Sequence, residues 1–304
     1  MTKAWVMGGL MALAAGCGGG KIGGVVAVVD GGETTTDDLR SATKVDASTP
    51  TDASTPGPSK FGDILLNADT YGSFADTSIL GFFDVTQPST ADAGTSGCTF
   101  STVGACSVVL CTGTPSGGGP APVPESAGTL TVTGDKTYAV VPTAMFDYSL
   151  DDTVAGWAPG GTITVSAAGS TVPAFLTTVT APAVVKIGAP TLSTSGAAPV
   201  FSRSSNLGLA WTGGTGAQLS MSLFNAAGTA SLTCTFDAGT GSASIPSSAL
   251  SMLPASTGYS FYGSTASDAA NATVTVKDWT VSVSVYANAQ SSAGEPYNET
   301  VTLQ

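Results

Sequence analysis

We expect an all-β protein whose body is made of antiparallel β-sandwiches. Charged residues are only 10% of the 304-residue chain, and abundant Thr, Ser, Gly, Ala and Val favour strands and tight turns over long surface helices. Short segments alternate apolar residues with Thr or Ser, so one face can meet a core while the other meets water. Gly, Asn and Asp separate these segments, which is the pattern of sandwiches with short connections.

The alternating segments run along the chain from Phe61 onward. One helical turn is expected between Ile245 and Pro254, with Ser247 or Ser248 as its N-cap. The clearest strands are expected at Thr129 to Thr133, Thr162 to Ser166, Gln218 to Leu223, Ser231 to Phe236, Thr273 to Val276 and Trp279 to Tyr286.

The chain divides into a leader, a tether and two sandwich domains. Turn-forming residues cluster at Gly188 to Pro199, which predicts a first domain at residues 61–190 and a second at 191–304. Residues 17–60 are rich in Gly, Thr, Asp, Ser and Pro and contain the repeat DASTPT, DASTPG. Such a segment cannot bury enough apolar surface to offset its ordering entropy, so we expect a disordered tether.

Residues 1–16 have the layout of a secretory signal. Lys3 gives a positive start, and Ala4 to Gly16 is apolar and too short to span a bilayer. The segment LAAGC, which ends at Cys17, resembles the lipobox of bacterial lipoproteins, although Ala14 stands where the family usually has Leu. The resemblance implies acyl chains on Cys17 that anchor the protein in a lipid bilayer. Gly18 then implies sorting to the outer membrane rather than the inner one, while an ordinary signal peptide with an incidental cysteine is the alternative.

The body also resembles a known group of proteins. The runs NLGLAWTGG, TCTF followed by IPSSALSMLP, and GACSVVLC with AGTLTVTG are similar to those of uncharacterised lipoproteins from large-genome Gram-negative bacteria. The resemblance covers most of the body and implies Ig-like sandwiches. Its motifs are structural, and it implies no catalytic residues.

Charge and composition exclude several function classes. The formal net charge is -12, and the basic residues after Phe61 are scattered, at Lys136, Lys186, Arg203 and Lys277. Nucleic acid is excluded as a partner, because binding its phosphates requires clustered cations. The sequence contains no histidine, which removes the commonest general base and the usual zinc ligand sets. We expect no cofactor.

Four cysteines remain in the body: Cys98, Cys106, Cys111 and Cys234. An even number in an exported protein indicates disulfides, and four cysteines allow three complete pairings. A hairpin of Gly97 to Ser101 with Ala105 to Cys111 would favour a Cys98–Cys106 bridge, leaving Cys111 and Cys234 joined or free. Zinc binding is disfavoured because no CxxC pair and no histidine accompany these thiols, so we expect no metal site.

The candidate ligand surface combines carboxylates with one loop tryptophan. Asp147, Asp151 and Asp152 form the densest acidic group, and they could serve glycoside hydrolysis or hold calcium, but acidic residues beside turns are usually just hydrated. Trp157 lies in a Gly- and Pro-rich loop, where an exposed aromatic ring is typical of binding surfaces.

Together these features favour a non-enzymatic lipoprotein, at the cell surface or in the periplasm. Its body would bind an envelope protein or a glycan, act in adhesion, or serve as an envelope spacer. The alternative is a histidine-free, glycan-directed hydrolase that uses two of the three clustered carboxylates.

The Cys17 anchor leads to the first prediction. Replacing Cys17 by Ser removes the only acylation site that the lipobox resemblance provides, so the protein should move from the membrane fraction to the soluble fraction. Cell fractionation followed by immunoblotting measures this, and circular dichroism should show an unchanged β body. Retention of the Cys17→Ser protein in the membrane fraction would mean that the anchor lies elsewhere.

Overall fold

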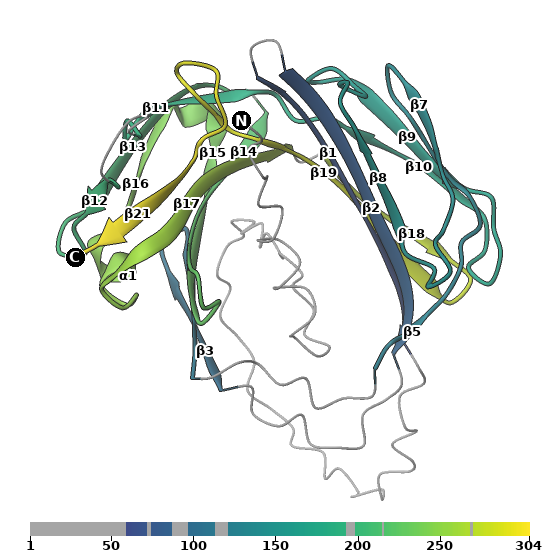
Figure 1. Ribbon diagram of the computed structural model, residues 1–304, viewed down its shortest axis with the longest axis horizontal. Helices are drawn as coiled ribbons and strands as arrows, with labels where there is room; N and C mark the ends of the chain where they lie inside the picture. Colours follow the sequence, from purple (N-terminus) through teal and green to yellow (C-terminus); the bar gives the residue numbers. More distant parts are fainter. Residues whose placement is uncertain are drawn as a thin grey trace, which may run out of the picture.

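The computed structural model describes residues 59–71, 74–86, 97–112, 121–192, 198–214, 216–267 and 270–304. In these ranges the chain is mostly β-strand, as Figure 1 shows. The signal and residues 17–58 of the tether expected from the sequence, including Cys17, lie outside the described residues, whereas Ser59 and Lys60, which were expected to end the tether, already belong to strand β1.

The fold is organised around one large sheet of 13 strands. Its main path runs β3-β4-β15-β14-β17-β19-β1-β2-β5, while β8, β12, β18 and β21 pair at its sides. These strands are β1 (Ser59–Tyr71), β2 (Phe74–Thr86), β3 (Cys98–Val103), β4 (Cys106–Cys111), β5 (Val123–Pro124), β8 (Tyr148–Asp152), β12 (Val200–Phe201), β14 (Ala217–Asn225), β15 (Ala230–Asp237), β17 (Ser256–Ser267), β18 (Asn271–Val276), β19 (Trp279–Asn288) and β21 (Asn298–Leu303).

Two smaller sheets of four strands each cover one face of the large sheet. The order in one is β10-β9-β6-β7 and in the other β16-β13-β11-β20. Their strands are β6 (Leu130–Thr133), β7 (Thr137–Val140), β9 (Thr162–Ala167), β10 (Phe175–Thr180), β11 (Val185–Ala189), β13 (Leu207–Gly213), β16 (Ser242–Ile245) and β20 (Gln290–Ser291). The large sheet therefore bends into an arch with a small sheet outside each limb (Figure 1).

Each limb has its own hydrophobic core between the large sheet and one small sheet. One core joins β1, β2 and β19 to the sheet of β6, β7, β9 and β10, with Phe83, Tyr148 and Trp279 in ring contact at its centre. The other joins β14, β15 and β17 to the sheet of β11, β13 and β16, and includes the ring pair Phe201 and Phe261. The predicted all-β sandwich fold is confirmed.

The predicted strands are also confirmed, within one or two residues at their ends. The predicted helical turn is α1 (Ser247–Leu250), and a short 3₁₀ turn, η1, spans Ala238–Thr240. The serine cap is wrong, because Pro246 occupies the N-cap and the Asn206 side chain accepts the Ser247 backbone N–H instead. Neither of the described helices is long and apolar enough to cross a membrane.

The two cores do not follow the order of the chain. The β3–β4 hairpin pairs with β15, so Cys106 and Val108 are buried in the core of the second half. Conversely, β19 pairs with β1 in parallel and places Trp279 in the core of the first half. The domain division at residue 190 stays a prediction, but strand pairing crosses it in both directions.

The favoured Cys98–Cys106 disulfide is wrong. The hairpin turn lies at Gly104 and Ala105, so Cys98 is directly opposite Cys111 in the register and bonds to it. Cys106 instead lies opposite Cys234 across the β4–β15 pair and forms the second disulfide. Sequence spacing could not show the second bridge, since its partners are 128 residues apart.

The two disulfides should differ in their contribution to stability. The Cys106–Cys234 bond closes a loop of 128 residues and the Cys98–Cys111 bond one of 13. Chain-entropy arguments then give a loss of about 5 kcal/mol for Cys106→Ala with Cys234→Ala, and about 3 kcal/mol for Cys98→Ala with Cys111→Ala. Urea denaturation of both double variants measures the difference. A larger loss for the Cys98–Cys111 pair would contradict the prediction.

Candidate functional site

The inner face of the large sheet, on the concave side of the arch (Figure 1), is a surface that neither core uses. Side chains alternate along each strand, so residues between the core positions face inward. On β1 and β2 these are Phe61, Asp63, Leu65, Asn67, Asp69, Tyr71, Phe74, Asp76, Ser78, Leu80, Phe82 and Asp84, and on β14, β15, β17 and β19 they include Ser220, Ser222, Phe224, Thr233, Thr235, Tyr262, Ser264, Ser282, Ser284, Tyr286 and Asn288.

Trp157 is not the exposed loop residue that the sequence suggests. Its side chain is only 4% exposed and belongs to the core of the first limb. The buried Thr77 hydroxyl donates to the Val154 carbonyl at 2.7 Å and accepts the Gly156 N–H at 2.7 Å, which ties the loop to β2. Gly134 allows the close approach, because a Cβ there would lie 2.8 Å from the Trp157 Cβ. The loop therefore turns its tryptophan inward.

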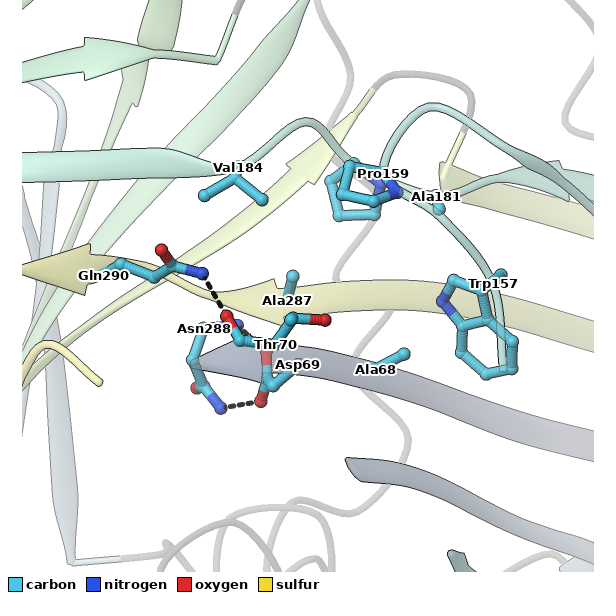
Figure 2. A pocket seen from close by; sticks show the side chains of 11 residues that line it. Ala68, Asp69, Thr70, Trp157, Pro159, Ala181, Val184, Ala287, Asn288 and Gln290 are labelled. Atoms are coloured by element: carbon cyan, nitrogen blue, oxygen red, sulfur yellow. Dashed lines mark hydrogen bonds between the residues drawn. The ribbon is translucent and has the colours of Figure 1, made fainter. Parts of the chain in front are cut away.

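Trp157 does line a small cleft between the limbs, shown in Figure 2. Pro159 and Val184 lie on one side of the strands, whereas the Asp69 and Asn288 side chains point to the opposite side. The cleft volume is about 20 Å³, which is room for about one water molecule. This cleft is too small to hold an organic ligand.

The three clustered carboxylates do not converge on one site. Asp152 points away from the inner face and pairs with Lys136 at 2.5 Å, which lowers the pKa of its carboxyl. Asp151 lies opposite Ser78 on the inner face, and its charge contributes to raising the pKa of Asp76. Asp147 precedes β8, and its charge contributes to raising the pKa of Asp84, after the effect of burial. The three side chains thus lie in three separate environments.

Another acidic group lies where the two limbs meet. Asp69 and Asp76 are directly opposite each other on β1 and β2, and Tyr71 follows two residues after Asp69. From β19, the Asn288 backbone N–H donates to Asp69 Oδ1 at 2.8 Å and its Nδ2 donates to Asp69 Oδ2 at 2.5 Å. Tyr286 lies two residues before Asn288 on the same face. We call these five residues the apex cluster.

Two polar atoms of the apex cluster are buried without a hydrogen bond. Among the described residues, neither the Tyr71 hydroxyl nor Asp76 Oδ1 has a partner, and Tyr71 is only 6% exposed. The ion pairs of the described part of the chain are Lys60–Asp278 and Lys136–Asp152, so no cation neutralises Asp69 or Asp76 there. Unpaired buried polar groups are costly, and they mark sites where a partner can bind.

The pKa values of the cluster follow from this burial and charge. Burial first, and then the neighbouring Asp69 carboxylate, raise the pKa of Asp76 to about 6. Burial and the same carboxylate raise the pKa of Tyr286 to about 12. The pKa of Tyr71 is raised as well, by burial and then by the charge of Asp69. Each shift favours the form with less negative charge.

The apex cluster is not a metal centre of the usual kind. In the described ranges, no group of three or more His, Cys, Asp or Glu residues is arranged to hold a metal ion. Sequence reasoning missed this cluster because its two halves are about 220 residues apart, as the Asn288 to Asp69 bond shows. The available signal was local: in the segment DTYGSFAD, two aspartates flank a short polar stretch, and the antiparallel pairing of β1 with β2 places Asp69 opposite Asp76.

Asp76 should make stability depend on pH. Its pKa is about 6 in the fold and 3.8 in the unfolded chain, so ionisation disfavours folding. The unfavourable contribution of Asp76 ionisation to the folding free energy reaches its full size above about pH 6, and it disappears as pH falls toward about pH 4. Asp76→Asn should therefore raise the melting temperature at about pH 8, and the wild type should approach the variant on acidification.

Thermal melts of both proteins between about pH 5 and pH 8 measure this difference. Asp152→Asn is the control, because Lys136 lowers the pKa of Asp152 and keeps this carboxyl ionised in the fold over that range. Its difference from the wild type should stay flat. A flat difference for Asp76→Asn as well would show that the Asp76 pKa is not raised.

Comparison with known proteins gives no family for this chain: no protein-family model matches it, and no curated protein matches it either. Its function is therefore inferred from the arrangement of its own residues.

Proposed function

We propose that the protein is an exported lipoprotein, anchored to the outer membrane through Cys17, whose inner face binds an envelope glycan or protein. The observation that carries the binding role is the inner face itself. Both small sheets pack on the other side of the large sheet, so this concave surface is left with polar and aromatic side chains that no core needs.

The chemistry of the inner face suits a binding surface better than a merely solvated one. Phe224 and Tyr262 are in edge-to-face contact there, with ring centroids 5.6 Å apart, and Phe61 meets Phe82 in the same way at 6.4 Å. Tyrosine rings with a hydroxyl supply both apolar contact and hydrogen bonding, which is why they are enriched in interfaces. Sugars and peptides both offer the apolar patches and polar groups that such rings recognise.

Hydroxyl groups lie on β14 and β15, beside the Phe224–Tyr262 pair. Ser222 and Thr233 bond across β14 and β15 at 3.1 Å, and Ser220 and Thr235 do so at 3.4 Å. Because each hydroxyl can both donate and accept, the array can exchange these bonds for bonds to a ligand. Aromatic rings beside a hydroxyl array on a concave sheet support binding of an extended ligand.

Hydrolysis is the second candidate, and one observation favours it. Asp69 and Asp76 lie directly opposite each other on the inner face, and the Asp76 pKa of about 6 is suited to a general acid. The original candidates Asp147, Asp151 and Asp152 do not converge, so this pair replaces them. Turnover of a panel of aryl glycosides and esters that is abolished by Asp76→Asn would establish hydrolysis.

A binding screen tests the leading proposal. Full-length protein is applied to immobilised envelope glycans and to outer-membrane proteins, and binding is measured by biolayer interferometry. Tyr262→Ala should weaken binding about tenfold, as expected when a central aromatic contact is removed. Leu176→Ala is the matched control, because Leu176 is 68% exposed on β10, outside the inner face. It should leave affinity within about twofold.

Two outcomes would contradict the proposal. Binding that Tyr262→Ala leaves unchanged but Leu176→Ala weakens would place the binding surface outside the inner face. Absence of binding to every glycan and protein of the panel, with unchanged membrane attachment, would favour a spacer role.

A further inference from the structure

Two hydrogen-bond acceptors of the apex cluster have no donor among the described residues. Asp76 Oδ1 is buried and accepts no hydrogen bond from any described residue, and the hydroxyl of the nearly buried Tyr71 is also unpaired. Asp69 differs, because both its oxygens accept bonds from Asn288 and its orientation is fixed. A ligand group at this place must donate hydrogen bonds to Asp76 and Tyr71.

The charges around Asp76 indicate that the ligand group that donates these hydrogen bonds is positively charged. The charges of Asp69 and Asp151 both act on Asp76, so a neutral ligand would leave the repulsion between the carboxylates in place. Within the described ranges both ion pairs lie elsewhere, at Lys60 and Lys136, so the chain itself supplies no counter-charge to the cluster there. A positive group would remove this repulsion. The Tyr286 ring beside the carboxylates adds an aromatic wall of the kind that attracts cations.

The burial of the two acceptor atoms limits the size of the ligand group that can reach them. Tyr71 is only 6% exposed, and its hydroxyl and Asp76 Oδ1 are both buried, so a bulky group cannot reach these two unpaired atoms. A sugar amine is attached directly to its ring, and a guanidinium is a wide planar fork. A primary ammonium at the end of a flexible four-carbon chain is compact and carries three donors.

We propose that the apex cluster binds the ammonium group of a lysine side chain from a partner polypeptide. Asp76 Oδ1 and the Tyr71 hydroxyl accept its N–H groups, the oriented Asp69 carboxylate supplies long-range attraction, and Tyr286 flanks it. The inference rests on the proposed binding role of the inner face and makes it more specific, because it identifies a protein as the partner and lysine as the recognised residue.

The site should lose affinity in acid. Asp76 is faced by Asp69 and Tyr71 from β1, Asp151 from β8 and Tyr286 from β19. Of these groups with shifted pKa values, only Asp76 changes charge near pH 6, since its pKa is raised to about 6 and that of Tyr286 to about 12. Its protonation removes the charge that the ammonium pairs with, and so binding should weaken as pH falls from about 7 to about 5.

The test uses lysine mimics with the full-length protein. Nα-acetyl-lysine methylamide is titrated at about pH 8 by saturation-transfer NMR, with two controls. The Nε-acetylated form lacks the charge, and the Nε-trimethyl form keeps the charge but has no N–H donors. We expect binding of the first compound alone, at least about tenfold stronger than that of either control.

Substitutions in the apex cluster test whether the lysine mimic binds there. Asp76→Asn should weaken the lysine mimic at least about tenfold, and Tyr71→Phe several-fold, because each removes one acceptor. Asp84→Asn is the matched control: it removes one carboxylate from the same strand and face, away from the cluster, and should leave affinity within about twofold. Thermal melts verify that each variant is folded, and Tyr71→Phe supplies an independent test if Asp76→Asn is not.

Equal binding of the trimethyl form, equal losses in Asp76→Asn and Asp84→Asn, or no binding of the lysine mimic would overturn the inference. The proposed function is judged separately, by the envelope screen. If Asp76→Asn binds envelope ligands as well as the wild type does while Tyr262→Ala does not, the inner face is the binding surface and the lysine site is wrong.

Discussion

The pairing of β19 with both limbs is the constraint on which the rest of the structure depends. Trp279 to Tyr286 run parallel to β1, and Ala287 and Asn288 then pair with β17. One strand thereby belongs to both halves of the large sheet and makes them continuous. Because side chains alternate along it, β19 places Trp279, Val281, Val283 and Val285 in a core and Ser282, Ser284, Tyr286 and Asn288 on the inner face.

A continuous sheet that is packed on one face has consequences for the other face. Each small sheet packs on the apolar side of the strands that it covers. The two cores together therefore bury the outer face of the large sheet along the arch. The inner face contributes to neither core, so it can carry hydroxyls, carboxylates and tyrosines at little cost to core packing. Its composition is therefore open to selection for binding, which the Thr- and Ser-rich alternation of the sequence already reflects.

The sequence predicted the strands, whose alternation is local, but not the pairing between distant strands. Alternation identifies a strand such as Trp279–Asn288, but it says nothing about which strand lies beside it. For that reason the Cys106–Cys234 bond, the parallel β1–β19 pairing and the apex cluster were not found. Trp157 failed for a related reason: its burial depends on Thr77, about 80 residues earlier, which accepts the Gly156 N–H. The acidic cluster at Asp147 to Asp152 was adjacent in sequence, yet β8 directs its members to different faces.

The apex cluster conflicts with what folding alone would select. Among the described residues, a buried acceptor has no partner and two opposed carboxylates have no cation; both lower stability, and replacing Asp76 by an uncharged residue would relieve both. The conflict is also local: Asp152 on β8 and Asp278 in the turn between β18 and β19 have lysine partners. Destabilising arrangements that persist in an otherwise consistent fold occur mainly at functional sites. The cluster lies beside the strand that joins the two limbs, so a ligand that neutralises it would stabilise the junction itself and couple binding to the rigidity of the arch.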